Sequence, residues 1–116
     1  MVSSGRSQAS SRLREFDLIR ALKQRYGAAH SSIVRGIGDD AAVIGSSHNT
    51  RQLVTTDLLA EGIHFTRRTA SFADIGFRAA TANLSDIAAM GGTPQYLLVS
   101  MAMPRDATAR QVRQLY

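Results

Sequence analysis

The sequence contains no cysteine among its 116 residues, and its 9 acidic residues are outnumbered by 14 lysines and arginines. Without cysteine the chain forms no disulfide, no thiolate metal site and no cysteine nucleophile, and it suits a reducing compartment such as the cytoplasm. The longest mostly apolar run, residues 96–103, is too short to span a membrane. The first residues hold no apolar signal-peptide core. The length and the 44% hydrophobic content predict one small globular domain.

The excess of positive charge does not indicate a nucleic-acid partner. Arg6, Arg12 and Arg14 supply three of the five excess charges. The other arginines are scattered along the chain, and no aromatic residues alternate with them as single-strand binding requires. A loose affinity for polyphosphates is all that the charge supports.

The first half of the chain predicts a tail, a helix and a hairpin. Residues 1–11 are mostly small and polar without apolar periodicity, which is typical of a disordered tail. Apolar residues at helical spacing predict a helix over residues 12–26, ended by Gly27. Two strand-like runs, residues 41–44 and 52–58, are joined by a polar loop and predict a β-hairpin.

The second half predicts a long helix, a strand and the start of a third helix. The long helix is expected over residues 71–90 and is closed by Gly91 and Gly92. Residues 96–103 are almost continuously apolar and predict a buried strand. Asp106 is expected to cap a further amphipathic helix, in which the chain stops. We therefore expect a truncated polypeptide.

Three aspartates interrupt apolar runs, where a carboxylate is costly unless it is paired, hydrogen-bonded or bound to a cation. They are Asp40, Asp57 and Asp86. If the hairpin pairs Ile44 with Leu53, the antiparallel register places Asp40 opposite Asp57. Like charges in that position repel each other, and a bound cation would reverse the sign of the interaction.

The third aspartate belongs to the predicted long helix. Asp86 shares a face with three apolar residues at helical spacings, which are Ile75, Ala79 and Ala82. That face should point toward the sheet rather than to water. Thr55 and Thr56 add hydroxyl and backbone oxygens beside Asp57. Together these oxygen donors predict a divalent-metal site of the kind that holds Mg²⁺.

Plainer interpretations exist for each of these residues. Asp40 and Asp57 would then be turn or strand-end residues, and Asp86 would cap a local backbone group. Residues 36–41 match the dinucleotide fingerprint GxGxxA, but strand rather than helix is expected to follow, so we reject that match. His64 is either a solvated strand-end residue or a contact for a substrate phosphate. No serine lies in a nucleophile elbow.

Three motifs carry a specific resemblance. They are GIGDDAA at residues 36–42, TTDLLAEGIHF at 55–65 and NLSDIAAMG at 83–91. The chain resembles the thiamine-monophosphate kinases of the aminoimidazole ribonucleotide synthetase-like superfamily. The resemblance implies an α/β chain of the α+β two-layer type, with a mixed sheet packed on helices. Residues 12–116 would form an incomplete N-terminal domain that binds metal and ATP phosphates and dimerises in a cytoplasmic enzyme.

The same resemblance assigns roles to individual residues. The metal ligands would be Asp40, Thr55, Thr56, Asp57 and Asp86, and His64 would contact the phosphate of thiamine monophosphate. No catalytic side chain is assigned. Leu58 stands where the family often has threonine. The implied reaction moves the γ-phosphoryl of ATP to thiamine monophosphate with Mg²⁺, and gives thiamine diphosphate and ADP.

Two alternatives remain at this point. The family's Gly-Gly-Asp motif and C-terminal domain are absent from this sequence, so the chain could instead be a non-catalytic remnant. Such a remnant would act as a dimerisation module or bind metal and nucleotide weakly. A selenophosphate or aminoimidazole ribonucleotide synthetase is a third option, against which residues 57–65 and 83–90 argue.

Overall fold

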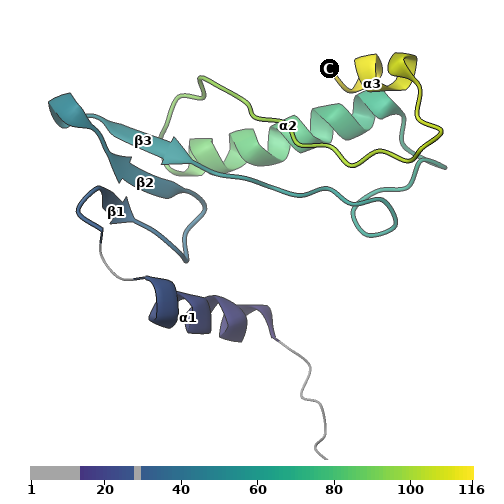
Figure 1. Ribbon diagram of the computed structural model, residues 1–116. Helices are drawn as coiled ribbons and strands as arrows, with labels where there is room; N and C mark the ends of the chain where they lie inside the picture. Colours follow the sequence, from purple (N-terminus) through teal and green to yellow (C-terminus); the bar gives the residue numbers. More distant parts are fainter. Residues whose placement is uncertain (1–13, 28–29) are drawn as a thin grey trace, which may run out of the picture.

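A computed structural model of the protein describes residues 14–27 and 30–116. The expected tail at residues 1–11 lies outside the described residues. Figure 1 shows the elements along the chain. In order they are α1 (Glu15–Tyr26), β1 (Ile33–Arg35), β2 (Ala42–Gly45), the 3-10 turn η1 (Ser47–Asn49), β3 (Arg51–Val54), α2 (Phe72–Ala89) and α3 (Ala109–Leu115). The expected α+β class is confirmed, but the expected mixed sheet is wrong, because the sheet in the described part of the chain is antiparallel throughout.

The hairpin forms as expected, but the predicted register is wrong by one residue. Leu53 lies opposite Val43, and Ile44 lies opposite Gln52. The loop sets this register, because η1 occupies its centre and the Ser46 N–H donates to the Thr50 carbonyl at 3.1 Å. Both strands also end before the aspartates, so no ladder pairs Asp40 with Asp57.

A third strand, β1, was not anticipated from the sequence. It adds only three residues to the free edge of β2, and all three are exposed. The pairing shifts between Ile33 and Arg35, which face Ile44 and Val43 respectively. Such a bulge bends the strand. The bend leads the chain into the glycine-containing loop at residues 36–40.

Helix α2 matches its prediction closely because both of its ends carry strong signals. Ser71 caps the start, with its hydroxyl accepting from Asp74 N–H at 3.1 Å while the Asp74 carboxylate accepts from Ser71 N–H at 2.9 Å. Gly91, at φ +70°, provides the left-handed residue that ends the helix. Ile75 is buried and Asp86 is half-buried, which confirms the predicted inward face.

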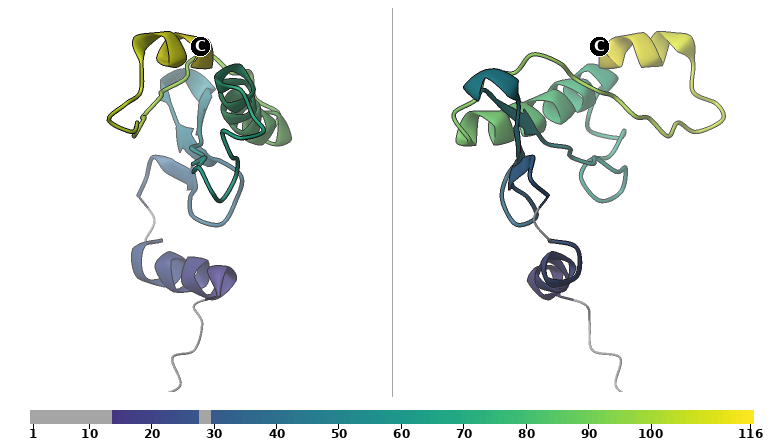
Figure 2. Two further views of the ribbon diagram at one scale, coloured as in Figure 1. Left: turned by 90° about the vertical axis from the view of Figure 1, so that its right-hand side faces the viewer. Right: turned by 60° about the vertical axis from the view of Figure 1, so that its left-hand side comes forward.

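Helix α3 lies against the N-terminal half of α2 (Figure 2). Its cap is Thr108 and not Asp106, so the prediction of Asp106 is wrong. Thr108 forms a capping box with Gln111, whose side chain accepts from the Thr108 N–H at 2.9 Å. The two helices approach so closely at Gly76 that a Cβ there would overlap the backbone carbonyl of Leu115.

The predicted buried strand at residues 96–103 is wrong. The segment has no strand assignment, and it runs as extended chain from the end of α2 back toward α3 (Figures 1 and 2). Tyr96 is 92% exposed and Leu98 is 96% exposed. A strand requires a neighbour to pair its backbone groups. Within residues 14–27 and 30–116, none lies alongside this segment.

Helix α1 confirms the predicted helix and its end at Gly27, although it begins at Glu15 rather than at residue 12. None of its residues is buried, and Figure 1 shows it apart from α2 and α3. Ala41 and Ile75 form the buried core of the described residues. No helix in the part of the chain that the structure describes is long and apolar enough to cross a membrane.

We expect Gly76→Ala to lower the free energy of unfolding by about 1–3 kcal/mol, because the added methyl group forces α3 away from α2. In an ordinary helix the same change raises stability by about 1 kcal/mol, so the sign is diagnostic. Urea unfolding followed by circular dichroism measures the effect. Ser85→Ala, at an exposed position of α2, is the matched control. Stabilisation by Gly76→Ala would show that α3 does not pack at this glycine.

The α2 cap should make stability depend on pH. Hydrogen bonds from the Ser71 hydroxyl and then from the Ser71 N–H lower the pKa of Asp74 below its ordinary value of 3.8. A carboxylate with a lowered folded-state pKa stabilises the fold above the unfolded-state pKa, and this contribution is lost as the pH falls through the folded-state pKa. Asp74→Asn should therefore lose less stability than the unchanged chain when the pH is lowered below about 4. Equal losses in thermal unfolding series would contradict this role.

Candidate functional site

Thr55 joins three segments that are far apart in the sequence. It is the first residue after β3 and is half-buried. Its hydroxyl lies 3.0 Å from the backbone carbonyl oxygen of Asp40 and 2.8 Å from Oδ2 of Asp86. The loop before β2, the end of β3 and the C-terminal part of α2 therefore meet at one hydroxyl group.

The proton count at this point is informative. A threonine hydroxyl has one hydrogen to donate, yet the Thr55 hydroxyl faces two acceptors. Three oxygen atoms therefore share one proton, and they include a carboxylate oxygen of Asp86. A half-buried cluster of hard oxygen donors with excess negative charge has the chemistry that Mg²⁺ prefers. The donors at Thr55 are thus one carboxylate oxygen and two neutral oxygens, all of the hard type that Mg²⁺ accepts.

An open pocket of about 430 Å³ lies beside this cluster. Its walls are formed by residues 36–42 and 54–56, together with Ile33 and Ile44. Gly38, at φ +106°, allows the loop to turn sharply into β2. A strand rather than a helix follows this loop, as predicted, so the GxGxxA match lacks the helix that a dinucleotide site requires. Asp40, Thr55 and Thr56 all line the pocket.

Asp39, which the sequence analysis did not single out, holds the loop in place. Its Oδ2 accepts from Arg35 Nη1 at 2.5 Å, and its Oδ1 accepts from the Asp40 N–H at 3.0 Å. The Arg35 hydrogen bond is the main reason that the pKa of Asp39 lies below its ordinary value. The sequence signal for this ion pair is that Arg35 and Asp39 carry opposite charges and are four residues apart, with two glycines between them. Asp39 therefore shapes the backbone that presents Asp40.

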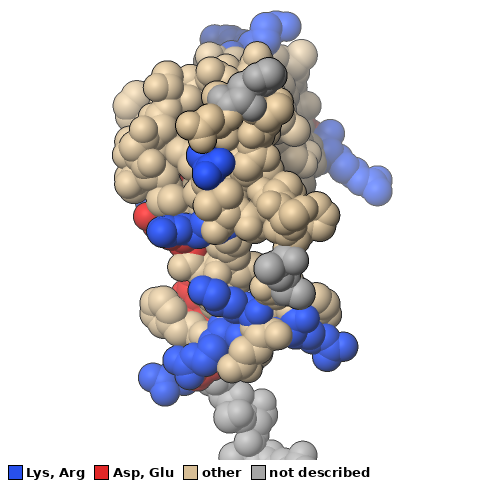
Figure 3. Space-filling model, turned by 90° about the vertical axis from the view of Figure 1, so that its left-hand side faces the viewer, with Lys and Arg blue, Asp and Glu red and all other residues tan. Residues whose placement is uncertain are grey.

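Positive charge lies next to this loop. A second hollow, of about 470 Å³, is lined by Lys23, Tyr26, Arg35 and Asp39 among others. Figure 3 shows lysine and arginine side chains gathered toward α1, whose last turn carries Lys23 and Arg25. The pocket at Asp40 therefore has a cationic neighbour on the α1 side.

The structure brings together only part of the predicted site. Asp40, Thr55, Thr56 and Asp86 form or border the cluster, whereas Asp57 neither lines the pocket nor takes part in the hydrogen bonds at Thr55. The register that placed Asp57 opposite Asp40 was wrong by one residue. Across the described residues, no three histidine, aspartate or glutamate side chains gather to hold a metal ion. The five-residue ligand set therefore stays a prediction.

His64 lies on a tight turn rather than at a strand end. The turn begins at Glu61 and closes at Phe65, with Gly62 at φ +81° and its N–H donating to the Phe65 carbonyl at 2.8 Å. The His64 ring is exposed, and its Nδ1 accepts from the Ala60 N–H at 3.0 Å. Its contact with a substrate phosphate also stays a prediction.

The geometry defines an α+β domain with an oxygen-rich pocket at the edge of a small sheet, and comparison with known families places it. Residues 38–116 match the family described as AIR synthase related protein, N-terminal domain. The chain belongs to this family. The match includes the pocket loop from Gly38 onward, Thr55 and Asp86. No solved structure is significantly similar to this chain.

Curated relatives narrow the likeness further. The chain is 43% identical over 102 residues to the thiamine-monophosphate kinase of Bacillus subtilis, covering 88% of this chain and 31% of that protein. It is 46% identical over 79 residues to that of Synechococcus elongatus, covering 68% and 24%. The protein of the same name from Methanocaldococcus jannaschii is 34% identical over 103 residues, covering 88% and 32%. The chain spans about a third or less of the length of these relatives.

Thr55→Val should separate the hydroxyl from the shape of the side chain. The change leaves the half-buried Asp86 carboxylate without its donor, and we expect a loss of about 1–3 kcal/mol in unfolding free energy. Thr55→Ser keeps the hydroxyl and should lose less than about 1 kcal/mol, the cost of one methyl group. Urea unfolding of both variants is the measurement. Equal losses would show that packing, not the hydrogen bond, matters at Thr55.

Proposed function

We propose that this chain carries the N-terminal metal- and ATP-phosphate-binding part of an enzyme that phosphorylates thiamine monophosphate to thiamine diphosphate. The names of the curated relatives support the reaction, and the oxygen cluster at Thr55 is the observation that supports the site. A kinase role in thiamine biosynthesis follows from the same proposal. Its partners would be ATP, thiamine monophosphate and a second copy of the chain, in the cytoplasm.

The residues that would hold Mg²⁺ are Asp40, Thr55, Thr56, Asp57 and Asp86. All five offer oxygen, and three of them are carboxylates. Bound there, Mg²⁺ would neutralise the negative oxygens of the transferring and accepting phosphates. Thr55 lines the pocket and its hydroxyl donates to the Asp86 carboxylate, so this carboxylate lies one hydrogen bond away from the pocket wall.

The accepting group explains why no general base is needed. A phosphate monoester has its second pKa at about 6, so it is largely ionised at neutral pH and already nucleophilic. The chain then has to align two phosphates and balance their charge. The pocket at residues 36–42 provides room next to the oxygen cluster, and Lys23 adds positive charge nearby, since the charge of Arg35 is paired with Asp39. His64 would orient the phosphate of thiamine monophosphate.

The proposal predicts that Asp57→Asn and Asp86→Asn each weaken Mg²⁺–ATP binding by at least about tenfold, the loss typical of a disturbed metal site. Turnover should be abolished while the fold is nearly unchanged. Calorimetry on this chain measures binding, and an assay for ADP and thiamine diphosphate measures turnover. The matched control is Asp17→Asn, which removes an exposed carboxylate from α1. The Bacillus subtilis relative serves as the positive control.

The outcomes separate the two functions. Retained Mg²⁺–ATP affinity in both variants would contradict the metal assignment. Binding of Mg²⁺–ATP without any thiamine diphosphate would favour the alternative, a non-catalytic module that binds metal and nucleotide. Formation of thiamine diphosphate that disappears in Asp57→Asn would support the kinase.

A further inference from the structure

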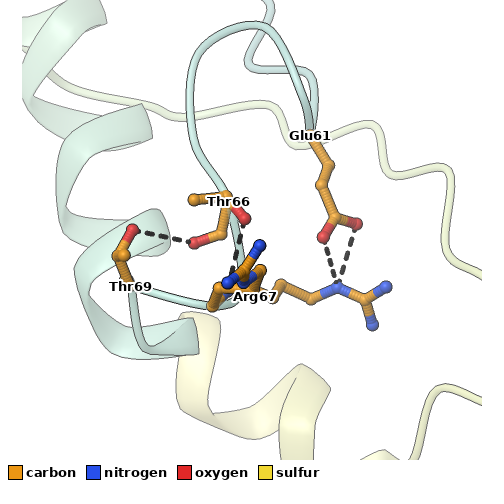
Figure 4. A network of polar contacts seen from close by, with 5 residues as sticks. Glu61, Thr66, Arg67 and Thr69 are labelled. Carbon is orange, nitrogen blue, oxygen red and sulfur yellow. Dashed lines mark hydrogen bonds and ion pairs between the residues drawn. The ribbon is translucent and has the colours of Figure 1, made fainter.

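The turn that carries His64 is closed by its own polar contacts. The Ile63 and His64 N–H groups donate to the Ala60 carbonyl at 3.2 and 2.9 Å. Arg67 Nε donates to both carboxylate oxygens of Glu61, at 2.8 and 2.9 Å. Figure 4 shows this ion pair across the base of the loop, with Thr66 and Thr69 on its other side. The loop is therefore a built unit, although it is exposed.

The contact at the ring assigns the tautomer of His64. A backbone N–H is always a donor, so Nδ1 must act as the acceptor in its 3.0 Å hydrogen bond with the Ala60 N–H. A neutral imidazole that accepts at Nδ1 carries its hydrogen on Nε2. Nε2 forms no hydrogen bond within the described part of the chain. The ring thus offers one N–H donor to the surroundings.

Arg78 fastens this turn to α2. Its Nη1 donates to the backbone carbonyl of His64 at 2.7 Å, across 14 residues of sequence. The same helix carries Asp86, which lies eight residues later, about 12 Å further along the helix axis. The turn and the oxygen cluster are therefore attached to one rigid element. Neither contact of His64 was visible in the sequence pattern.

We propose that Arg78 is a positioning residue, which together with the Ala60 N–H holds His64 so that Nε2–H is the donor offered to a substrate phosphate. The choice of phosphate rests on the proposed function. Arg78 acts through the His64 backbone, so its charge is not required at the substrate. Arg78→Lys keeps a donor at this position and should preserve part of the effect.

The first test reads the tautomer directly. Long-range ¹H–¹⁵N correlation spectra of the labelled chain distinguish Nδ1–H from Nε2–H, and His64→Gln identifies the signals among the three histidines. We expect Nε2–H in the unchanged chain, a mixture in Arg78→Ala and a largely restored Nε2–H in Arg78→Lys. Arg68→Ala, which removes a neighbouring exposed arginine, should leave the tautomer unchanged. An Nδ1–H tautomer in the unchanged chain would overturn the inference.

The second test compares thiamine monophosphate with thiamine, which lacks the phosphate. Arg78→Ala should weaken binding of thiamine monophosphate about threefold to tenfold, the effect of one lost hydrogen bond, and leave thiamine unaffected. Equal weakening of both ligands would show that Arg78 only supports the fold and would overturn the inference. If the unchanged chain binds neither ligand, the proposed function fails. The tautomer of His64 then tests the positioning role by itself. A tautomer mixture in Arg78→Ala that returns largely to Nε2–H in Arg78→Lys supports the role, and identical spectra of the two variants overturn it.

Discussion

The hydrogen bond between the Thr55 hydroxyl and the Asp86 carboxylate is the contact on which the arrangement of the site depends. It connects the sheet to α2 at a half-buried position, where a carboxylate without a donor would be costly. The same hydroxyl reaches the Asp40 carbonyl, so the loop before β2 is fixed to both. This one hydroxyl therefore links the pocket loop, the end of β3 and α2.

Local signals predicted the helices better than the sheet. The bounds of α2 could be read from the sequence because Ser71 and Asp74 form a capping box and Gly91 ends the helix, and these are short-range interactions. The hairpin register could not be predicted, because it depends on η1 and its hydrogen bond inside the loop. Residues 96–103 are apolar enough for a strand, but composition does not supply the neighbour that a strand needs.

The same distinction applies to the candidate site. Asp86 was found because helical periodicity places it on the inward face with Ile75, and Thr55 because it offered oxygen beside an aspartate. Asp57 was placed by a register that proved wrong, so its metal role now rests on the resemblance alone. Arg78 was missed because its contact with His64 spans 14 residues and depends on the shape of a turn. Its side chain carries no pattern that distinguishes it from other exposed arginines.

Helix α2 sets the spacing between the His64 turn and the oxygen cluster at Thr55. Arg78 donates a hydrogen bond to the His64 turn, and Asp86, further along the helix, accepts one from Thr55 in the oxygen cluster. The distance along the helix and the angle around it between Arg78 and Asp86 are set by the number of intervening residues rather than by the side chains of those residues. One residue inserted or deleted between them would rotate Arg78 relative to Asp86 by about 100° around the helix axis. This stretch of α2 should therefore accept many substitutions but no change in length.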